Sequence, residues 1–136
     1  MSLSEEDRNT LIDFRMEKSD EAMKDVELLV GNGRWTAAAN RLYYAAYYAV
    51  SALMLCYRIE AKTHEGIIRM FSKEFVLTGI FEVKYGRLYS DLYTKRITGD
   101  YSDSFNVEQV DVEPLVEPTH DFIEKVKALV NAKRNS

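Results

Sequence analysis

The stretch from residue 35 to residue 57 constrains the fold most, because it is apolar on almost every side. It contains one charged residue, Arg41, and no glycine or proline. Apolar residues recur in it at intervals of three and four, which is the spacing of one face of a helix. The first such stripe comprises Ala38, Leu42, Ala45, Ala49, Ala52 and Cys56. A helix that is apolar all round is expected at the centre of a protein or at a contact between subunits.

Four further helices are expected around this one, because the helical spacing recurs and the boundaries carry capping residues. Ser4 and Thr63 are N-cap candidates, since a side-chain oxygen there can accept a hydrogen bond from the first turn. The expected helices run from Ser4 to Gly31, from Thr63 to residues 78–79 and from Phe81 to Gly99, and the last contains Phe122, Val126, Leu129 and Val130. Pro114 and Pro118 leave the start of the last helix open, because proline lacks an N–H. Residues 101–106 are polar, and we expect them to be mobile.

Length and composition agree with an all-α fold, a compact up-and-down bundle of about five helices that forms one domain over residues 1–136. Six glycines and two prolines are too few for a many-stranded fold with frequent turns. Cys56 is the single cysteine, so no intramolecular disulfide can form and a cytoplasmic location is expected. No apolar stretch approaches the roughly 20 residues of a membrane span, and we expect no membrane partner.

The charge of the chain is distributed unevenly around a net value of -4. Residues 31–101 carry ten bases against six acids, whereas both ends of the chain are acidic. This basic middle section could hold a phosphate-bearing ligand, but a solvated helix face is the simpler interpretation. Its small excess of positive charge falls far short of the dense basic stripe expected of an autonomous duplex-DNA binder.

Familiar catalytic and metal-binding motifs are absent from the sequence. His64, His120 and Cys56 are the strong soft or borderline metal ligands, and no two of them have ligand spacing. There is no HExxH, GxSxG or phosphate-binding P-loop pattern. The sequence therefore predicts no metal and no cofactor. His64 falls in the first turn of the third expected helix, where a capping role or a surface hydrogen bond is the simple interpretation.

Polar chemistry is concentrated in residues 96–101, which read Arg-Ile-Thr-Gly-Asp-Tyr. An arginine in the last turn of a helix is favoured by the helix dipole, and that explanation is purely structural. A guanidinium group held by a carboxylate also offers a rigid fork for phosphate oxygens. Gly99 would let the chain turn so that Asp100 and Tyr101 point back toward Arg96. From the residues alone, a structural ion pair and a phosphate site are both open.

Three motifs in this order resemble the HEPN domain family, and the resemblance spans most of the chain. They are residues 41–49 (RLYYAAYYA), residues 62–66 (KTHEG) and residues 96–101 (RITGDY). The likeness is greatest to the small stand-alone prokaryotic branch of the family. It implies a compact bundle of four or five helices, often homodimeric, and often encoded beside a minimal nucleotidyltransferase as a toxin and antitoxin pair.

The resemblance also implies functional residues. Many HEPN proteins are similar to metal-independent ribonucleases that use an arginine and a histidine four to six residues apart. Arg96 matches that arginine, but Tyr101 stands where the histidine is expected, and a phenol with a pKa of about 10 is a poor base at neutral pH. His64 could replace it only if the fold placed it near Arg96.

The interpretation that follows is a non-catalytic or atypical module that binds a nucleotide, RNA or a partner protein. Its predicted ligand-binding residues are Arg96, Asp100 and Tyr101, with Arg41 and His64 as neighbours. Arg96 is also the one candidate for a catalytic residue. Two alternatives remain open: a metal-independent RNase toxin, and a purely structural homodimeric bundle whose tyrosine-rich helix forms the contact.

Overall fold

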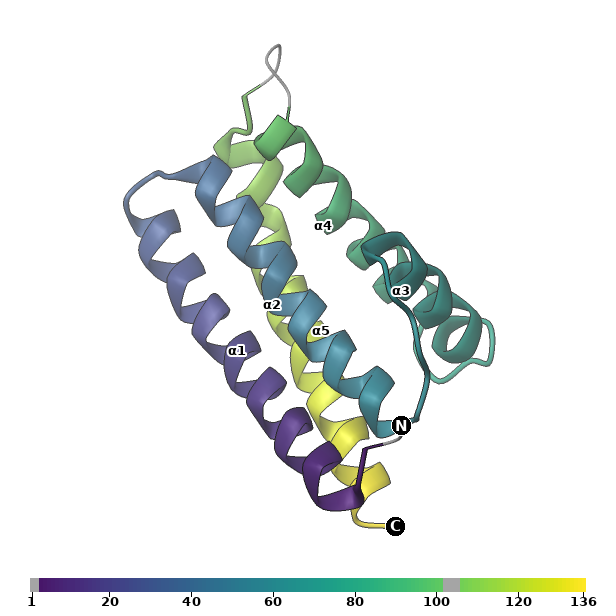
Figure 1. The fold of residues 1–136 in the computed structure, drawn as a ribbon. Coiled ribbons are helices and arrows are strands. Elements are labelled where there is room, and N and C mark those ends of the chain that lie inside the picture. The colour runs from purple at the N-terminus through teal and green to yellow at the C-terminus, as the bar shows by residue number, and fades with distance from the viewer. Residues whose placement is uncertain (1–2, 102–105) are drawn as a thin grey trace.

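A computed structural model describes residues 3–101 and 106–136, and within these ranges it contains helices and no strand (Figure 1). The helices are α1 (Glu5–Gly31), α2 (Trp35–Cys56), α3 (His64–Phe71), α4 (Val83–Tyr101) and α5 (Gln109–Arg134), and a π-helical turn, η1 (Ser72–Val76), continues α3. The predicted all-α bundle of about five helices is confirmed. None of the described helices is long and apolar enough to cross a membrane.

The α2 helix lies at the centre of the bundle, as its apolar character predicts. The long helices α1, α2, α4 and α5 run alternately up and down, and α3 lies beside α4 (Figure 1). The α2 helix contacts each of the other four helices. Its alanines let α1 approach closely, because a small side chain keeps little distance between helix axes. At this contact the buried hydroxyl of Ser19 donates a hydrogen bond of 2.7 Å to the carbonyl oxygen of Ala45.

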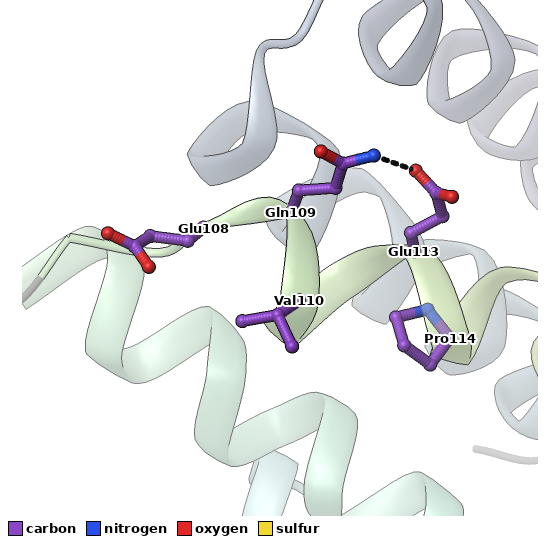
Figure 2. Close-up of a pocket in the computed structure, with 5 residues that line it drawn as sticks. All are labelled: Glu108, Gln109, Val110, Glu113 and Pro114. Carbon is purple, nitrogen blue, oxygen red and sulfur yellow. Dashed lines mark hydrogen bonds between the residues drawn. The ribbon is translucent and has the colours of Figure 1, made fainter.

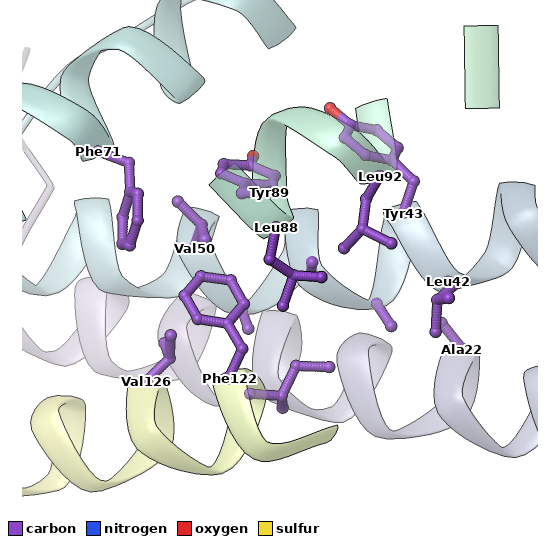
Figure 3. Packing of buried hydrophobic residues seen from close by; sticks show 14 of the residues in the cluster. Ala22, Leu42, Tyr43, Val50, Phe71, Leu88, Tyr89, Leu92, Phe122 and Val126 are labelled. Carbon is purple, nitrogen blue, oxygen red and sulfur yellow. The ribbon is translucent and has the colours of Figure 1, made fainter. Parts of the chain in front are cut away.

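An aromatic cluster joins α3, α4 and α5 (Figure 3). Its central member is Phe122 of α5, which is fully buried. The ring centre of Phe122 lies 5.4 Å from that of Phe71, 5.8 Å from that of Phe81 and 5.6 Å from that of Tyr85. Because α3 carries His64 at its first residue, this cluster helps to fix where that histidine lies.

The helix starts follow the predicted capping residues in two places. The Ser4 side chain accepts a hydrogen bond of 3.0 Å from the backbone N–H of Asp7, and the Thr63 side chain accepts one of 2.9 Å from the backbone N–H of Gly66. The expected start of the fourth helix at Phe81 was wrong, because α4 begins at Val83 and Phe81 lies buried before it.

The last helix includes both of its prolines. It begins at Gln109, after a capping box in which Glu108 and Asp111 each accept a hydrogen bond from the other's backbone N–H. Pro114 and Pro118 lie inside α5, where each removes one backbone donor. The prediction that residues 101–106 are mobile concerns mainly residues 102–105, which lie outside the described residues.

Candidate functional site

The α4 helix continues through Gly99, so the prediction that this glycine ends the helix was wrong. A Cβ atom at this position would lie 3.2 Å from the Cγ2 atoms of both Thr36 and Val107. The missing side chain lets α4 approach the start of α2 closely, and a Cβ here would press on these two methyl groups. Asp100 consequently reaches Arg96 by the four-residue spacing of a helix and not through a turn.

Arg96 and Asp100 form an ion pair that α2 holds in place. The Nε atom of Arg96 lies 3.0 Å from Oδ2 of Asp100, and the two side chains are 13% and 25% exposed. Asn40 donates a hydrogen bond of 3.0 Å from its Nδ2 atom to the same Oδ2 atom. The Arg96 Nε–H is not aligned with the carboxylate and has no hydrogen-bond partner among the described residues. The guanidinium group is therefore positioned by its neighbours.

Tyrosine rings surround the Arg96 guanidinium group. Its Cζ atom lies 5.9 Å from the ring centre of Tyr43, 5.5 Å from that of Tyr44 and 5.7 Å from that of Tyr101. A cation over an aromatic face is worth about 0.5–2 kcal/mol, so three such rings restrict the arginine strongly. The Tyr101 side chain is 70% exposed, which leaves much of its ring open to a ligand.

Arg41 approaches the same tyrosine from α2. Its Cζ atom lies 5.3 Å from the ring centre of Tyr44, so Arg41 and Arg96 both contact this one ring. Arg41 makes no ion pair with an acid in the described part of the chain, and its buried Nε atom has no hydrogen-bond partner there. Among the described residues, Asp100 is the one carboxylate that pairs with either guanidinium group, and the remaining positive charge suits an anionic ligand.

His64 lies in the same cluster and does not serve as a cap. Its Nδ1 atom is 2.6 Å from the hydroxyl oxygen of Tyr43, and its ring centre is 4.7 Å from that of Tyr47 and 5.9 Å from that of Tyr44. The sequence interpretation of a capping or surface role was therefore wrong, since Thr63 caps α3 and His64 bonds to a buried phenol. The condition for a role beside Arg96 is met, because both side chains contact Tyr43 and Tyr44.

The protonation of His64 follows from its surroundings. Burial lowers the pKa of His64 and the positive charge of Arg96 lowers it further, so the imidazole is neutral at neutral pH. Burial raises the pKa of Tyr43 far above its ordinary value, so this phenol keeps its proton. The Tyr43 hydroxyl and Nδ1 of His64 share a hydrogen bond, which leaves Nε2 of the neutral imidazole outside this bond.

The tyrosines of α2 divide between the core and the site. The sequence predicts the whole helix at the centre of the protein or at a subunit contact, and the fully buried Tyr43 is part of the core. Tyr44 and Tyr47, however, are half-buried beside His64 and Arg96. The sequence does contain a pattern that groups two of these tyrosines with Arg41. Arg41, Tyr44 and Tyr47 recur every three residues and so share one side of a helix. The docking of α3 against this side could not be seen from the sequence.

Arg41 and Asp100 also border a cavity of about 690 Å³ at the start of α2. Arg34, Trp35 and Asn40 line it as well. The first turn of α2 has neither an acidic residue nor a side-chain cap, so its free backbone N–H groups add positive potential beside the two arginines.

Two other places in the described part of the chain bring polar groups together. A cavity of about 630 Å³ at the start of α5 is lined by Glu108, Gln109, Val110, Glu113 and Pro114, and none of these is a predicted site residue (Figure 2). Its carboxylates make it unsuitable for an anion. On the exposed face of α5, Glu117, His120 and Asp121 bring one potential metal-ligand atom each within 4.8 Å of the others. The sequence pattern did not indicate this surface trio, and the absence of a metal stays a prediction.

Comparison with known proteins decides the family. The family model of the HEPN domain matches residues 12–129, which include every predicted site residue. The chain belongs to the HEPN domain family. A "UPF0332 protein" of Thermotoga maritima is 31% identical over 124 residues, which cover 91% of this chain and 94% of that protein. "Putative toxin MJ0142" of Methanocaldococcus jannaschii is 30% identical over 118 residues, covering 87% of this chain and 80% of that protein.

The predicted resemblance to HEPN proteins is thereby confirmed. In this HEPN chain, Tyr101 occupies the position five residues after Arg96, and it lies in the last turn of the same helix. The histidine that the fold brings to Arg96 is His64, which comes from α3 and not from the motif of residues 96–101.

Proposed function

We propose that this HEPN protein binds a nucleotide or an RNA end through Arg41 and Arg96. The observation that carries the proposal is that both guanidinium groups contact the ring of Tyr44, with Asp100 as the one carboxylate paired to either among the described residues. Guanidinium groups bind phosphate oxygens through paired hydrogen bonds, and a phosphate between them would neutralise the excess positive charge.

The surrounding side chains supply contacts for the rest of a nucleotide. Tyr101 is exposed and Tyr44 is half-buried, so each can offer part of a ring for a base to stack on. Nε2 of His64 is not used in the bond to Tyr43, so it is the ring nitrogen that can form a hydrogen bond with a ligand. The two guanidinium groups and the aromatic faces together favour an anionic, planar ligand.

Binding without cleavage is favoured by the state of His64. Metal-independent RNA cleavage needs a base that removes the proton of the 2′-hydroxyl group. The motif of residues 96–101 contains no histidine, and Nδ1 of His64 is already engaged in a hydrogen bond with Tyr43.

A thermal-stability measurement with purine nucleotides and short RNAs tests this function. A ligand at about 100 times its Kd stabilises the native state by about 2.7 kcal/mol, which raises Tm measurably. Arg96→Ala is expected to abolish that rise. Arg87→Ala is a matched control, since Arg87 is exposed on the same helix and nine residues away, on its opposite side. No rise with any ligand, or a rise that Arg96→Ala retains in full, would contradict the proposal.

A metal-independent RNase toxin is the second candidate function. It is favoured by the neutral state of His64 beside Arg96 and by the name of the Methanocaldococcus relative. In this case His64 would exchange its hydrogen bond with Tyr43 so that a nitrogen becomes free to act as a base. RNA cleavage in the presence of a chelator should then be lost in both Arg96→Ala and His64→Gln. Equal cleavage by the variants and the wild type would point to a contaminating nuclease.

The predicted partners remain proposals of the same kind. A homodimer and a minimal nucleotidyltransferase partner are both consistent with the half-buried tyrosines of α2, because tyrosine is common at protein contacts. Light scattering at micromolar concentration tests the homodimer, and a purely monomeric protein would contradict it.

A further inference from the structure

A cavity of about 400 Å³ lies farther along α2, outside the site around Arg96, and is bordered by α1, α2, α3 and the segment that joins α2 to α3. Its lining includes two basic residues, Arg15 of α1 and Lys62 of the joining segment, and one acid, Glu60. Here the half-buried Arg15 of α1 donates a hydrogen bond to the side chain of Ser51, which is 3% exposed. Among the described residues Arg15 makes no ion pair. Its hydrogen bond to Ser51 is the one side-chain hydrogen bond that it forms there. A half-buried cation that makes no ion pair is costly, and an anion at the mouth of the cavity would relieve that cost.

Three tyrosines connect this cavity to the site around Arg96. Tyr47 lines the cavity and also contacts His64, with 4.7 Å between their ring centres. The ring centre of Tyr47 lies 5.7 Å from that of Tyr44 and 5.6 Å from that of Tyr48. All three tyrosines are half-buried. Aromatic rings therefore occupy the surface of α2 between Arg41 at one end and the Arg15–Ser51 pair at the other.

The length of this surface exceeds that of one nucleotide. Residues 41 and 51 are ten positions apart, which corresponds to about 15 Å along a helix at 1.5 Å per residue. Stacked bases rise by about 3.4 Å each, so about four nucleotides would cover the same distance.

The charge along the surface has the sign that a nucleic acid strand requires. The residues that line the two cavities and the site between them include the bases Arg15, Arg34, Arg41, Lys62 and Arg96 and the acids Glu60, Glu65 and Asp100. Bases outnumber acids here although the whole chain has a net charge of -4. Positive groups interleaved with aromatic rings are typical of proteins that bind single strands, whose unpaired bases can stack.

We infer that the ligand is a single-stranded RNA that runs along α2, with one phosphate at Arg41 and Arg96 and a second phosphate at Arg15. Its bases stack on Tyr44, Tyr47 and Tyr48. This inference rests on the proposed function of the Arg96 site and adds a second binding subsite to it. A duplex does not fit as well, because its bases are stacked on each other and are not available to the tyrosines.

The experiment compares the affinities of a purine mononucleotide and of an unstructured RNA octanucleotide, measured by calorimetry and fluorescence anisotropy. The wild type should bind the octanucleotide more tightly than the mononucleotide. Arg15→Ala should weaken octanucleotide binding about tenfold, because it removes one charge-assisted phosphate contact, while mononucleotide binding is unchanged. The salt dependence of octanucleotide binding should also fall by about 0.7 in the slope of log K against log salt.

Matched variants separate this subsite from general effects. Lys24→Ala removes an exposed cation nine residues along α1 from Arg15, on the opposite side of the helix, and should change neither affinity. Arg15→Gln removes the charge but retains a donor for Ser51, and it should lower octanucleotide binding as well. It keeps the test valid if Arg15→Ala does not fold, which far-ultraviolet circular dichroism would show.

The outcomes distinguish this inference from the proposed function. If the octanucleotide binds no more tightly than the mononucleotide, or if neither Arg15 variant weakens it, the second subsite is overturned while the Arg96 site stands. If neither ligand binds the wild type, the proposed function fails as well. If the Arg15 variants disrupt self-association without weakening RNA binding, this surface belongs to a contact with a second copy of the chain, and the inference is overturned.

Discussion

Truncation of Phe122 to alanine should destabilise the protein more than any change at the surface. The Phe122 ring is fully buried and lies within 6 Å, centre to centre, of the rings of Phe71, Phe81 and Tyr85. Replacing such a ring removes its hydrophobic burial and leaves a cavity that the helices can fill only partly. The expected cost is about 3–5 kcal/mol of the free energy of unfolding, which is a large share of the 5–15 kcal/mol typical of a domain.

Urea unfolding followed by far-ultraviolet circular dichroism measures this loss directly. For a chain of this size, 3–5 kcal/mol corresponds to a fall in Tm of about 10–20 °C. Phe14→Ala is the matched control, because it makes the same chemical change in α1 where the side chain is 52% exposed. Its expected cost is about 1 kcal/mol or less. Equal losses in the two variants, or a loss below about 1 kcal/mol for Phe122→Ala, would refute the packing described for α3, α4 and α5.

Two further predictions concern the site. Because the folded-state pKa of His64 lies below its unfolded value of about 6.5, the unfolded chain takes up this proton first as pH falls. The His64 contribution to stability is therefore present above about pH 6.5 and lost as pH falls through the folded pKa. Urea titrations at several pH values should show that the stability of His64→Gln lacks this loss at low pH. A pH dependence equal to that of the wild type would contradict the prediction. Gly99→Val should lower the free energy of unfolding by about 1–3 kcal/mol, because the valine side chain would press on Thr36 and Val107. An unchanged Tm in calorimetric unfolding would show that α4 and α2 are not in close contact there.

Helix positions and cores were predictable because they depend on local chemistry. Ser4 and Thr63 mark helix starts through side-chain oxygens that bond within their own first turn. The central place of α2 follows from its lack of a polar face. Gly99 was misjudged for a tertiary reason. A glycine near a helix end usually signals a stop, but here the neighbouring α2 helix requires the missing side chain.

The arrangement of the predicted site residues could be predicted only in part from the sequence. Arg96 and Asp100 are four residues apart, so their pairing follows from helical spacing once α4 is known to continue. The approach of His64 to Arg96 depends on how α3 docks against α2 and α4, and no local pattern encodes that contact. The same holds for Arg15 and Ser51, which are separated by 36 positions and meet only in the folded chain.

The central claim is that Arg41 and Arg96 together bind a phosphate group. Nuclear magnetic resonance of the arginine Nε–H groups tests it most directly, because both Nε atoms are buried and without a hydrogen-bond partner in the described residues. Titration with a purine mononucleotide should shift the Nε–H signals of Arg41 and Arg96 with one common Kd and leave that of Arg87 unchanged. Saturable binding that leaves both signals in place would contradict the account.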